Sequence, residues 1–140
     1  MQFACNGNDY LVRIDKGEEV LSNLVSLCKQ QGIECASVSG IGASDDFTFG
    51  IFNTDSKTYV QTDVHEPAEI TSIVGNVTTQ NGNPYLHLHA TFAKEDGSVC
   101  GGHLNRAVIS VTCELFLHVC KIYTDRVKDD VGVNVISFKE

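Results

Sequence analysis

The sequence has no long hydrophobic run and no concentration of positive charge. No apolar stretch approaches the length that crosses a bilayer, so we expect no membrane span. A secretory signal begins with a charged segment that an apolar segment follows, whereas residues 1–9 are polar. The sequence therefore predicts a cytoplasmic location. Acidic residues outnumber basic residues 18 to 10, giving a net charge of −8, and Lys and Arg form no cluster. Because nucleic acid is bound chiefly through Lys and Arg, this charge pattern does not support autonomous DNA binding.

The length and composition are typical of one domain. The chain has 140 residues, of which 42% are hydrophobic, and this is enough to bury a core without cross-links. The sequence shows neither an internal repeat nor a low-complexity linker. We therefore interpret residues 1–140 as a single domain.

Hydrophobic periodicity predicts one helix and a series of strands. Residues 18–31 carry an apolar stripe, acidic residues stand near its start, and Gly32 is a typical stop. Strands predicted over residues 10–14 and 33–39 flank this helix and indicate a βαβ-like opening. Further strands are predicted at residues 47–53, 58–64, 69–79, 85–93, 99–104 and 107–123, the last being long enough to contain a bend or a bulge.

The segment Ser39-Gly40-Ile41-Gly42-Ala43 resembles a nucleotide-binding loop, but its context argues against that function. Such a loop opens directly into a helix. Here residues 45–49 are strand-like and begin with two aspartates, which would repel phosphate. We therefore interpret the two glycines as a turn between strands.

Three of the five histidines lie between Pro84 and Leu104. Successive side chains on a strand alternate between its faces, so His87 and His89 project from one face while the leucines beside them project from the other. His103 follows two glycines on the predicted returning strand of a hairpin.

The loop of this hairpin decides whether His103 joins the other two histidines. A two-residue loop at residues 96–97 turns His103 toward the core. A three-residue loop at residues 95–97, with its glycine left-handed, places His89 opposite His103. A bulge at residues 101–102 would restore the same arrangement in the first register. The sequence leaves these alternatives open.

Three imidazoles that converge on one polar face are suited to a borderline divalent cation. Zinc accepts imidazole nitrogen at about 2 Å and can keep a fourth position open for water or a ligand. Nickel, iron and copper also accept imidazole. We therefore predict a divalent metal site, with zinc as the first candidate, at His87, His89 and His103. The competing interpretation is that these are ordinary half-buried histidines or lie at a subunit contact.

Glu114 is the one further candidate for this site. It lies on the more polar face of the predicted strand at residues 107–123. If that face adjoins the histidine hairpin, Glu114 could be a metal ligand, a partner that orients an imidazole, or a general base. An exposed or interface carboxylate is the alternative. His118 shares this face but lies outside the cluster, and His65 has no partner in the sequence, so both are interpreted as structural.

The six cysteines show no C-x-x-C spacing, and most lie in apolar segments. We interpret them as reduced cysteines that pack in the interior. Cys100 lies in the histidine hairpin, where a ligand or redox role is the alternative to packing. The set comprises Cys5, Cys28, Cys35, Cys100, Cys113 and Cys120.

From about Tyr10 to Phe138 the sequence resembles the PPC domain (plant and prokaryote conserved). The resemblance rests on several blocks, of which the two that carry the histidines are the most specific together. These blocks are Arg13-Ile14-Asp15-Lys16-Gly17-Glu18-Glu19, Ser39-Gly40-Ile41-Gly42-Ala43, Pro67-Ala68-Glu69-Ile70 leading to Gly75-Asn76, His87-Leu88-His89, and Asp96-Gly97 before Gly101-Gly102-His103-Leu104.

The resemblance implies an α/β (α+β) fold in which an antiparallel-rich mixed sheet packs against one main helix, and it implies a homotrimer. It also implies that His87, His89 and His103 form a metal site near a subunit boundary. Plant relatives carry a basic AT-hook that contacts the minor groove, and bacterial stand-alone members are described as DNA-binding by similarity. This sequence shows no such hook, so we expect DNA to be contacted only indirectly or weakly. Plausible contributors to the subunit contacts are Phe47, Phe49, Phe52 and Phe116.

Two functions from different classes follow. The first is an interaction module, a trimeric metal-binding PPC protein that scaffolds or regulates and reaches DNA through a partner. The second is a metal-dependent enzyme, hydrolase- or lyase-like, in which Glu114 moves protons and the metal polarises water beside a small polar substrate. We favour the first, because no nucleophile elbow, carboxylate pair or H-E-x-x-H helix accompanies the histidines.

Overall fold

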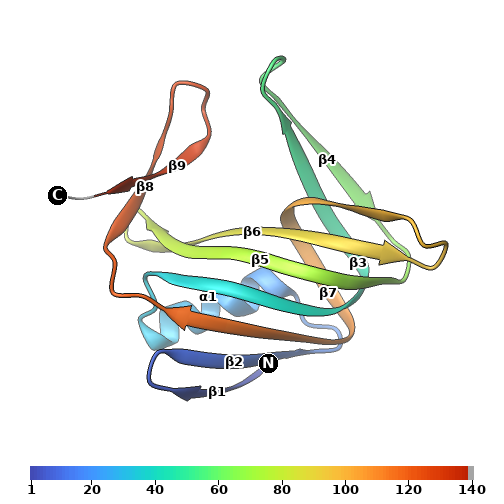
Figure 1. Cartoon of the computed structure of the whole chain (residues 1–140), viewed down its shortest axis with the longest axis horizontal. Helices are drawn as coiled ribbons and strands as arrows, with labels where there is room; N and C mark the ends of the chain where they lie inside the picture. The colour runs from blue at the N-terminus through green and yellow to red at the C-terminus, as the bar shows by residue number, and fades with distance from the viewer. Residues whose placement is uncertain (139–140) are drawn as a thin grey trace.

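The computed structural model describes residues 1–138 and contains one helix, α1 (Val20–Gln31), and nine strands (Figure 1). No helix within residues 1–138 is both long and apolar enough to cross a membrane. The strands are β1 (Gln2–Asn6), β2 (Asp9–Asp15), β3 (Ala36–Asn53), β4 (Thr58–Val64), β5 (Ala68–Gln80), β6 (Asn83–Lys94), β7 (Val99–Val119), β8 (Thr124–Lys128) and β9 (Asn134–Phe138).

Seven strands form one sheet, and β8 and β9 form a separate two-stranded sheet. The order in the large sheet is β1-β2-β7-β6-β5-β3-β4, with an additional pairing between β7 and β3. Each described pairing is antiparallel. Because β3 pairs with β5, β5 with β6, β6 with β7 and β7 with β3, these four strands close a circuit, and the sheet curls around its own core.

The predicted βαβ-like opening is present in a split form. Strands β2 and β3 both pair with β7 in the antiparallel sense, so they run parallel to each other with β7 between them. The helix between them begins where the Glu19 carboxylate accepts hydrogen bonds from the backbone N–H groups of Leu21 and Ser22. It ends at Gly32, which adopts a left-handed conformation with φ of 64°. The predicted acidic start and glycine stop are therefore confirmed.

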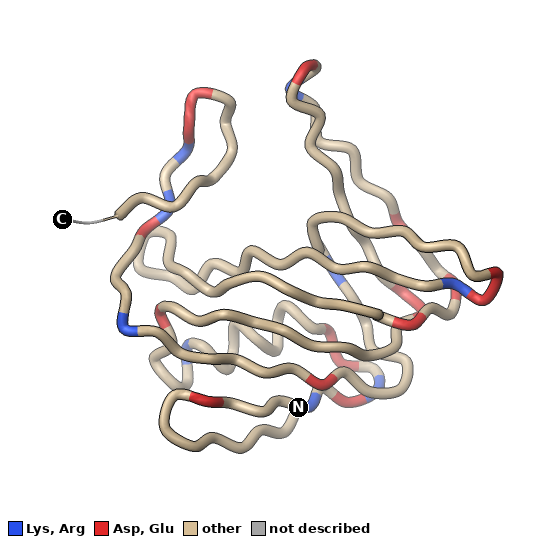
Figure 2. The backbone as a smooth tube through the Cα atoms, viewed as in Figure 1, with Lys and Arg blue, Asp and Glu red and all other residues tan. Residues whose placement is uncertain are grey.

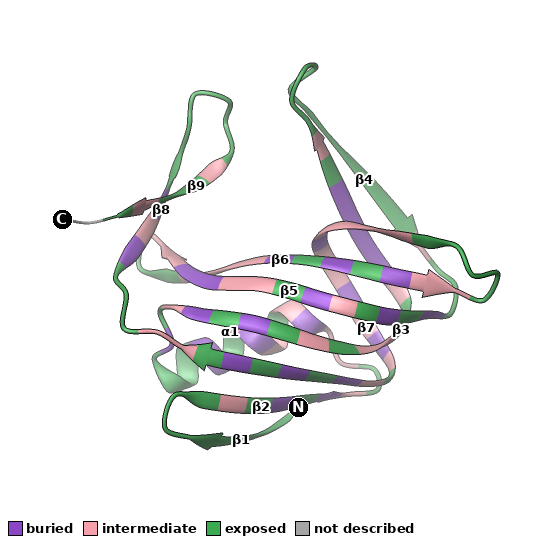
Figure 3. Cartoon of the chain, viewed as in Figure 1, coloured by how far each residue is buried: buried purple, intermediate pink, exposed green. Residues whose placement is uncertain are grey.

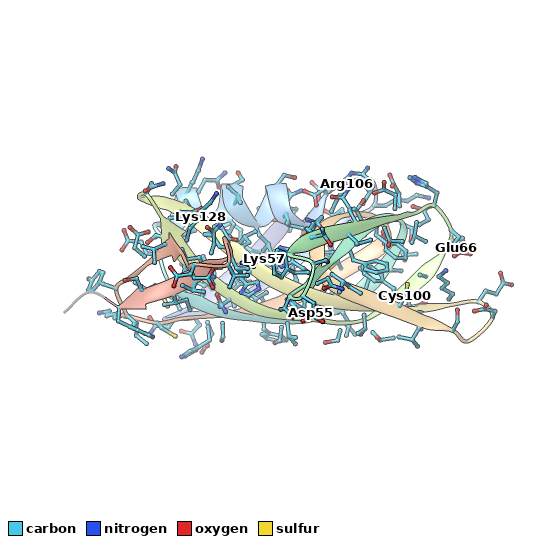
Figure 4. The ribbon with its side chains drawn as sticks, turned by 90° about the horizontal axis from the view of Figure 1, so that it is seen from above. Asp55, Lys57, Glu66, Cys100, Arg106 and Lys128 are labelled. Atoms are coloured by element: carbon cyan, nitrogen blue, oxygen red, sulfur yellow. The ribbon has the colours of Figure 1, made fainter. Side chains whose placement is uncertain are left out.

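The core lies between α1 and one face of the curled sheet. The buried side chains of α1 include Val20, Leu24 and Leu27. Inside the sheet, the rings of Phe47 and Phe92 stack with centroids 3.8 Å apart. Figure 4 shows α1 along one side of the sheet, whereas the opposite side carries no helix. That helix-free face is free to carry polar and functional side chains.

The glycine segment near residue 40 is not the turn that the sequence predicts. Strand β3 continues through it, and its register with β5 shifts between Gly40 and Gly42. A Cβ atom at Gly42 would lie 2.7 Å from the carbonyl oxygen of Thr112 and 2.8 Å from Cα of Cys113. The glycines therefore allow β7 to approach β3 closely at a bulge.

Three further features of the structure differ from the sequence-based expectations. The strands predicted at residues 99–104 and 107–123 are one bulged strand, β7, which ends at Val119. The strands β1, β8 and β9 have no counterpart among the predicted elements. Phe47 and Phe49 are buried in the core and cannot reach a neighbouring subunit, whereas Phe116 is exposed.

Candidate metal centre

The three-residue hairpin loop brings His103 to the other histidines. The backbone N–H of Lys94 donates to the carbonyl of Ser98, and Gly97 adopts a left-handed φ of 81°. This loop sets a register in which His89 faces His103 across β6 and β7. The second of the two registers considered from the sequence is therefore confirmed, and no bulge at residues 101–102 is needed.

The histidines lie on the helix-free face of the sheet. On β6 the side chains of Leu88, Ala90 and Phe92 are buried, while those of His87 and His89 point to the other face. One row of directly opposed residues crosses this face from β2 to the N-terminal part of β7. It comprises Leu11, Phe116, Ser39, Val74, His89 and His103.

The three imidazoles form a compact cluster. The ring centroid of His87 lies 5.3 Å from those of His89 and His103, and the latter two are 5.6 Å apart. One nitrogen from each ring lies within 4.8 Å of the others. Nitrogens bound at about 2 Å to one ion lie at most about 4 Å apart, so the three rings need only a small approach to share one ion. The donor set and its geometry therefore fit a divalent transition metal.

An open cavity of about 600 Å³ lies directly against the cluster. The β3–β4 and β8–β9 hairpins rise on the same side of the molecule in Figure 1, and residues from both line this cavity. Figure 3 shows that the tips of both hairpins are exposed. The lining residues are Gly50, Ile51, Phe52, Tyr59, Tyr85, His87, His89, Gly102, His103, Asn105, Gly132, Val133 and Asn134. A small molecule in this cavity would meet the histidine nitrogens.

Tyr59 on β4 reaches into the cavity across Gly50. Its hydroxyl donates to the Oδ1 atom of Asn105 at 2.6 Å, and its ring lies 6.3 Å from that of His103. A Cβ atom at position 50 would collide with the Tyr59 ring and hydroxyl. Glycine at this position is therefore what lets the tyrosine lie beside the cluster.

Arg126 on β8 lies next to His87 and is almost fully buried, with 5% of its surface exposed. Its guanidinium donates to Oγ1 of Thr78, to Oδ1 of Asn76 and to the carbonyl of Asn134, at 2.7 to 2.9 Å. Its Nη2 atom lies 3.5 Å from Nδ1 of His87, and its Cζ atom lies 4.6 Å from the centre of the Tyr85 ring. No pattern in the sequence around residue 126 indicates this position.

The surroundings favour neutral histidines. Burial, followed by the positive charge of Arg126 and the neighbouring histidines, lowers the pKa of His87 to about 4. Burial also lowers the pKa of His103, and His89 and Arg126 act in the same direction. Because a metal competes with protons for imidazole nitrogen, these lowered pKa values leave both rings ready to bind an ion near neutral pH.

Glu114 does not line the histidine cavity. It is exposed on the C-terminal half of β7, where it faces Arg13 on β2 and Ile41 on β3. It lines a different depression, together with Ile41 and Val111. Within this chain, Glu114 therefore lies outside the cavity that adjoins the histidines.

The remaining histidines and cysteines lie outside the cluster. Nδ1 of His65 is 3.1 Å from Asp46, and Nδ1 of His118 is 2.6 Å from Asp9. All six cysteines are free, and Cys100 faces the buried Phe92 across β6 and β7 without lining the cavity. Packing is therefore the interpretation of Cys100 that the structure supports.

Residues 1–121 match the Plants and Prokaryotes Conserved (PCC) domain. A search of curated proteins gave no match. Several solved structures are similar over nearly the whole chain. A protein from Bacteroides thetaiotaomicron, described as a "putative DNA binding protein", shares 33% identity with a TM-score of 0.94, and the alignment covers 98% of this chain and 96% of that one.

Two archaeal structures are also similar. A plant- and prokaryote-conserved (PPC) protein from Pyrococcus horikoshii shares 29% identity with a TM-score of 0.87, covering 99% of this chain and 96% of that one. A metal-containing protein from Archaeoglobus fulgidus shares 30% identity with a TM-score of 0.86, covering 96% and 97% respectively.

Proposed function

The chain belongs to the Plants and Prokaryotes Conserved domain family, and from that premise we propose that it is a trimeric, metal-binding regulatory module. Its metal site consists of His87, His89 and His103. The observation that carries the proposal is the convergence of these three nitrogens within 4.8 Å of one another. Zinc is the first candidate, because it accepts imidazole nitrogen and would supply a Lewis acid with room for a further ligand. The similar metal-containing protein from Archaeoglobus fulgidus supports the proposal.

The metal proposal is tested by elemental analysis of untagged protein. We expect about one zinc ion per chain in the parent and almost none in His87→Ala, because two imidazoles hold zinc far more weakly than three. His118→Ala is the matched control, because His118 is exposed and lies outside the cluster. Equal metal content in His87→Ala and the parent would contradict the proposal.

The trimer is supported by apolar side chains on the helix-free face. Four of them are between 47% and 59% exposed and lie near one another on β2, β3, β5 and β7: Leu11, Ile41, Val74 and Phe116. Contiguous apolar surface of this kind is typical of protein contacts. We propose that copies of the same chain contact one another through this surface. The metal site would then lie beside the subunit contact.

Any association with DNA is assigned to a partner protein. The chain carries a net charge of −8. Figure 2 shows Lys and Arg scattered over several elements rather than gathered on one side. In a mobility-shift assay at low salt, we expect the purified protein to leave duplex DNA unshifted, because Lys and Arg within residues 1–138 form no cationic surface that could displace counterions (Figure 2). A shift that weakens steeply as salt is raised would show direct binding and overturn this assignment.

A further inference from the structure

A guanidinium lies beside the histidine cluster, and no carboxylate of residues 1–138 lines the cavity next to it. None of the residues that line the cavity is Asp or Glu. Arg126 contacts three of the lining residues, Tyr85, His87 and Asn134, and its guanidinium donates hydrogen bonds to neutral groups. The backbone N–H of Arg126 donates to the carboxylate of Asp125. A divalent cation on the histidines would therefore add its charge to that of a fixed guanidinium. Like charges repel strongly in a partly buried site, and an anion beside them would relieve this repulsion.

The contact between Arg126 and His87 gives a second reason to expect an anion. A guanidinium has only donors, so Nδ1 of His87 is the acceptor in this 3.5 Å contact. A metal-bound His87 cannot keep this role: an ion on Nδ1 occupies the lone pair, and an ion on Nε2 leaves the proton on Nδ1. In both cases an N–H group of Arg126 loses its acceptor. A buried donor without an acceptor is costly, and an anion in the cavity beside His87 would offset part of this cost through its charge.

The walls of the cavity indicate what kind of anion fits. Ile51, Phe52 and Val133 are apolar, and Tyr59 and Tyr85 present aromatic rings. Apart from the histidines, the polar groups that line the cavity include the side-chain amides of Asn105 and Asn134. Such a lining is suited to a molecule with one charged end and an apolar body. A fully hydrated inorganic anion would leave the apolar walls without a partner.

We propose that this cavity binds a small organic carboxylate with an apolar or aromatic group, and that the carboxylate and the metal ion strengthen each other's binding through Arg126. The proposal rests on the proposed metal site. Arg126 acts as a positioning residue through its charge and its contact with His87. Because coupling between two ligands is reciprocal, the anion must raise the affinity for the metal by the same factor as the metal raises the affinity for the anion.

The test measures zinc affinity of chelator-treated, untagged protein by competition with a chromophoric chelator. Titrations are run in buffer alone and with benzoate, acetate or inorganic phosphate, with the chelator calibrated in each solution. We expect benzoate to raise the apparent zinc affinity about tenfold, a typical size for coupling between sites. Acetate, which lacks the apolar body, should have a smaller effect.

Two arginine variants separate the role of Arg126 from general charge. In Arg126→Met, zinc affinity without benzoate should rise, because a repelling charge is gone, while the benzoate effect should fall to less than about twofold. Arg106→Met is the matched control, because the guanidinium of Arg106 is bound to both carboxylate oxygens of Asp46, whereas that of Arg126 lies against His87. It should keep the full benzoate effect. Circular dichroism establishes that each variant is folded, and the parent titrations decide the proposal if Arg126→Met does not fold.

The outcomes distinguish this inference from the proposed function. Zinc binding that is equal with and without benzoate overturns the inference and leaves the metal site standing. No zinc binding under any condition overturns the metal site, and the inference with it. A phosphate effect as large as that of benzoate overturns the assignment to an organic carboxylate.

Discussion

At the scale of single residues, the environment of His87 disfavours its protonated form. The ring is half-buried between Arg126 and two other imidazoles, and its pKa falls from 6.5 to about 4. Desolvation and the nearby guanidinium both disfavour the protonated ring. Between these two pH values the unfolded chain therefore binds more protons than the folded chain.

We predict that the free energy of unfolding of the metal-free protein falls as the pH decreases from about 6.5 to about 4. A group whose pKa is lowered by folding stabilises the folded state above its unfolded pKa, and this contribution is lost below it. His87→Phe should show a shallower fall than the parent in urea unfolding at pH 7 and pH 5, with chelator present. His118→Phe is the control. Its free energy of unfolding should keep the dependence on pH that His87 supplies in the parent. Identical slopes in His87→Phe and the parent would refute the assignment.

At the scale of elements, the two long strands β3 and β7 build the site through their bulges. Their register shifts at several points between residues 42 and 49, which lets each strand bend and pair on both edges. Strand β7 thus packs against α1, while its N-terminal end carries His103 beside β6. Without these bends His103 and the cavity hairpins would not meet.

Gly42→Ala should therefore destabilise the fold by about 1–3 kcal/mol, because the added methyl group would press on the backbone of β7, which cannot move away as a flexible side chain could. Thermal and urea unfolding measure this loss. Asp45→Ala on the same strand is the control, since Asp45 is exposed, and its effect should stay within about 0.5 kcal/mol. A Gly42→Ala protein as stable as the parent would show that the close approach is not required.

The elements also show what the sequence could predict. The alternation of side chains along a strand correctly predicted the face of β6 that carries His87 and His89. The loop lengths considered for the hairpin included the observed register. Both features could be predicted because they depend on residues that are close together in the sequence. The continuity of β3 through its glycines depends on β7, which comes about 70 residues later in the chain. Arg126 likewise reaches His87 only through the folded position of β8. Contacts of this kind leave no local pattern in one sequence.

At the scale of the whole molecule, one face of the sheet combines the apolar surface with the metal cluster. The row of opposed residues that begins at Leu11 and includes Phe116 also ends at His89 and His103. The helix occupies the other face. In the proposed trimer, subunit contacts and the metal site would therefore be neighbours rather than separate regions.

Phe116→Glu should convert the proposed trimer to a monomer, because it introduces a charge into an apolar contact that has no partner for it. Light scattering coupled to size-exclusion chromatography measures the change in mass. Val60→Glu is the matched control: Val60 is 59% exposed, like Phe116, but lies on β4. The proposal fails if the parent is itself a monomer, or if Phe116→Glu keeps the mass of three chains.

The aromatic lining of the cavity has a practical consequence for studying it. The chain contains no tryptophan and four tyrosines, so its ultraviolet emission comes from tyrosine alone. Two of these four, Tyr59 and Tyr85, border the cavity. Filling that space would alter a large share of the molecule's intrinsic fluorescence, so the protein carries its own optical reporter of occupancy and needs no attached dye.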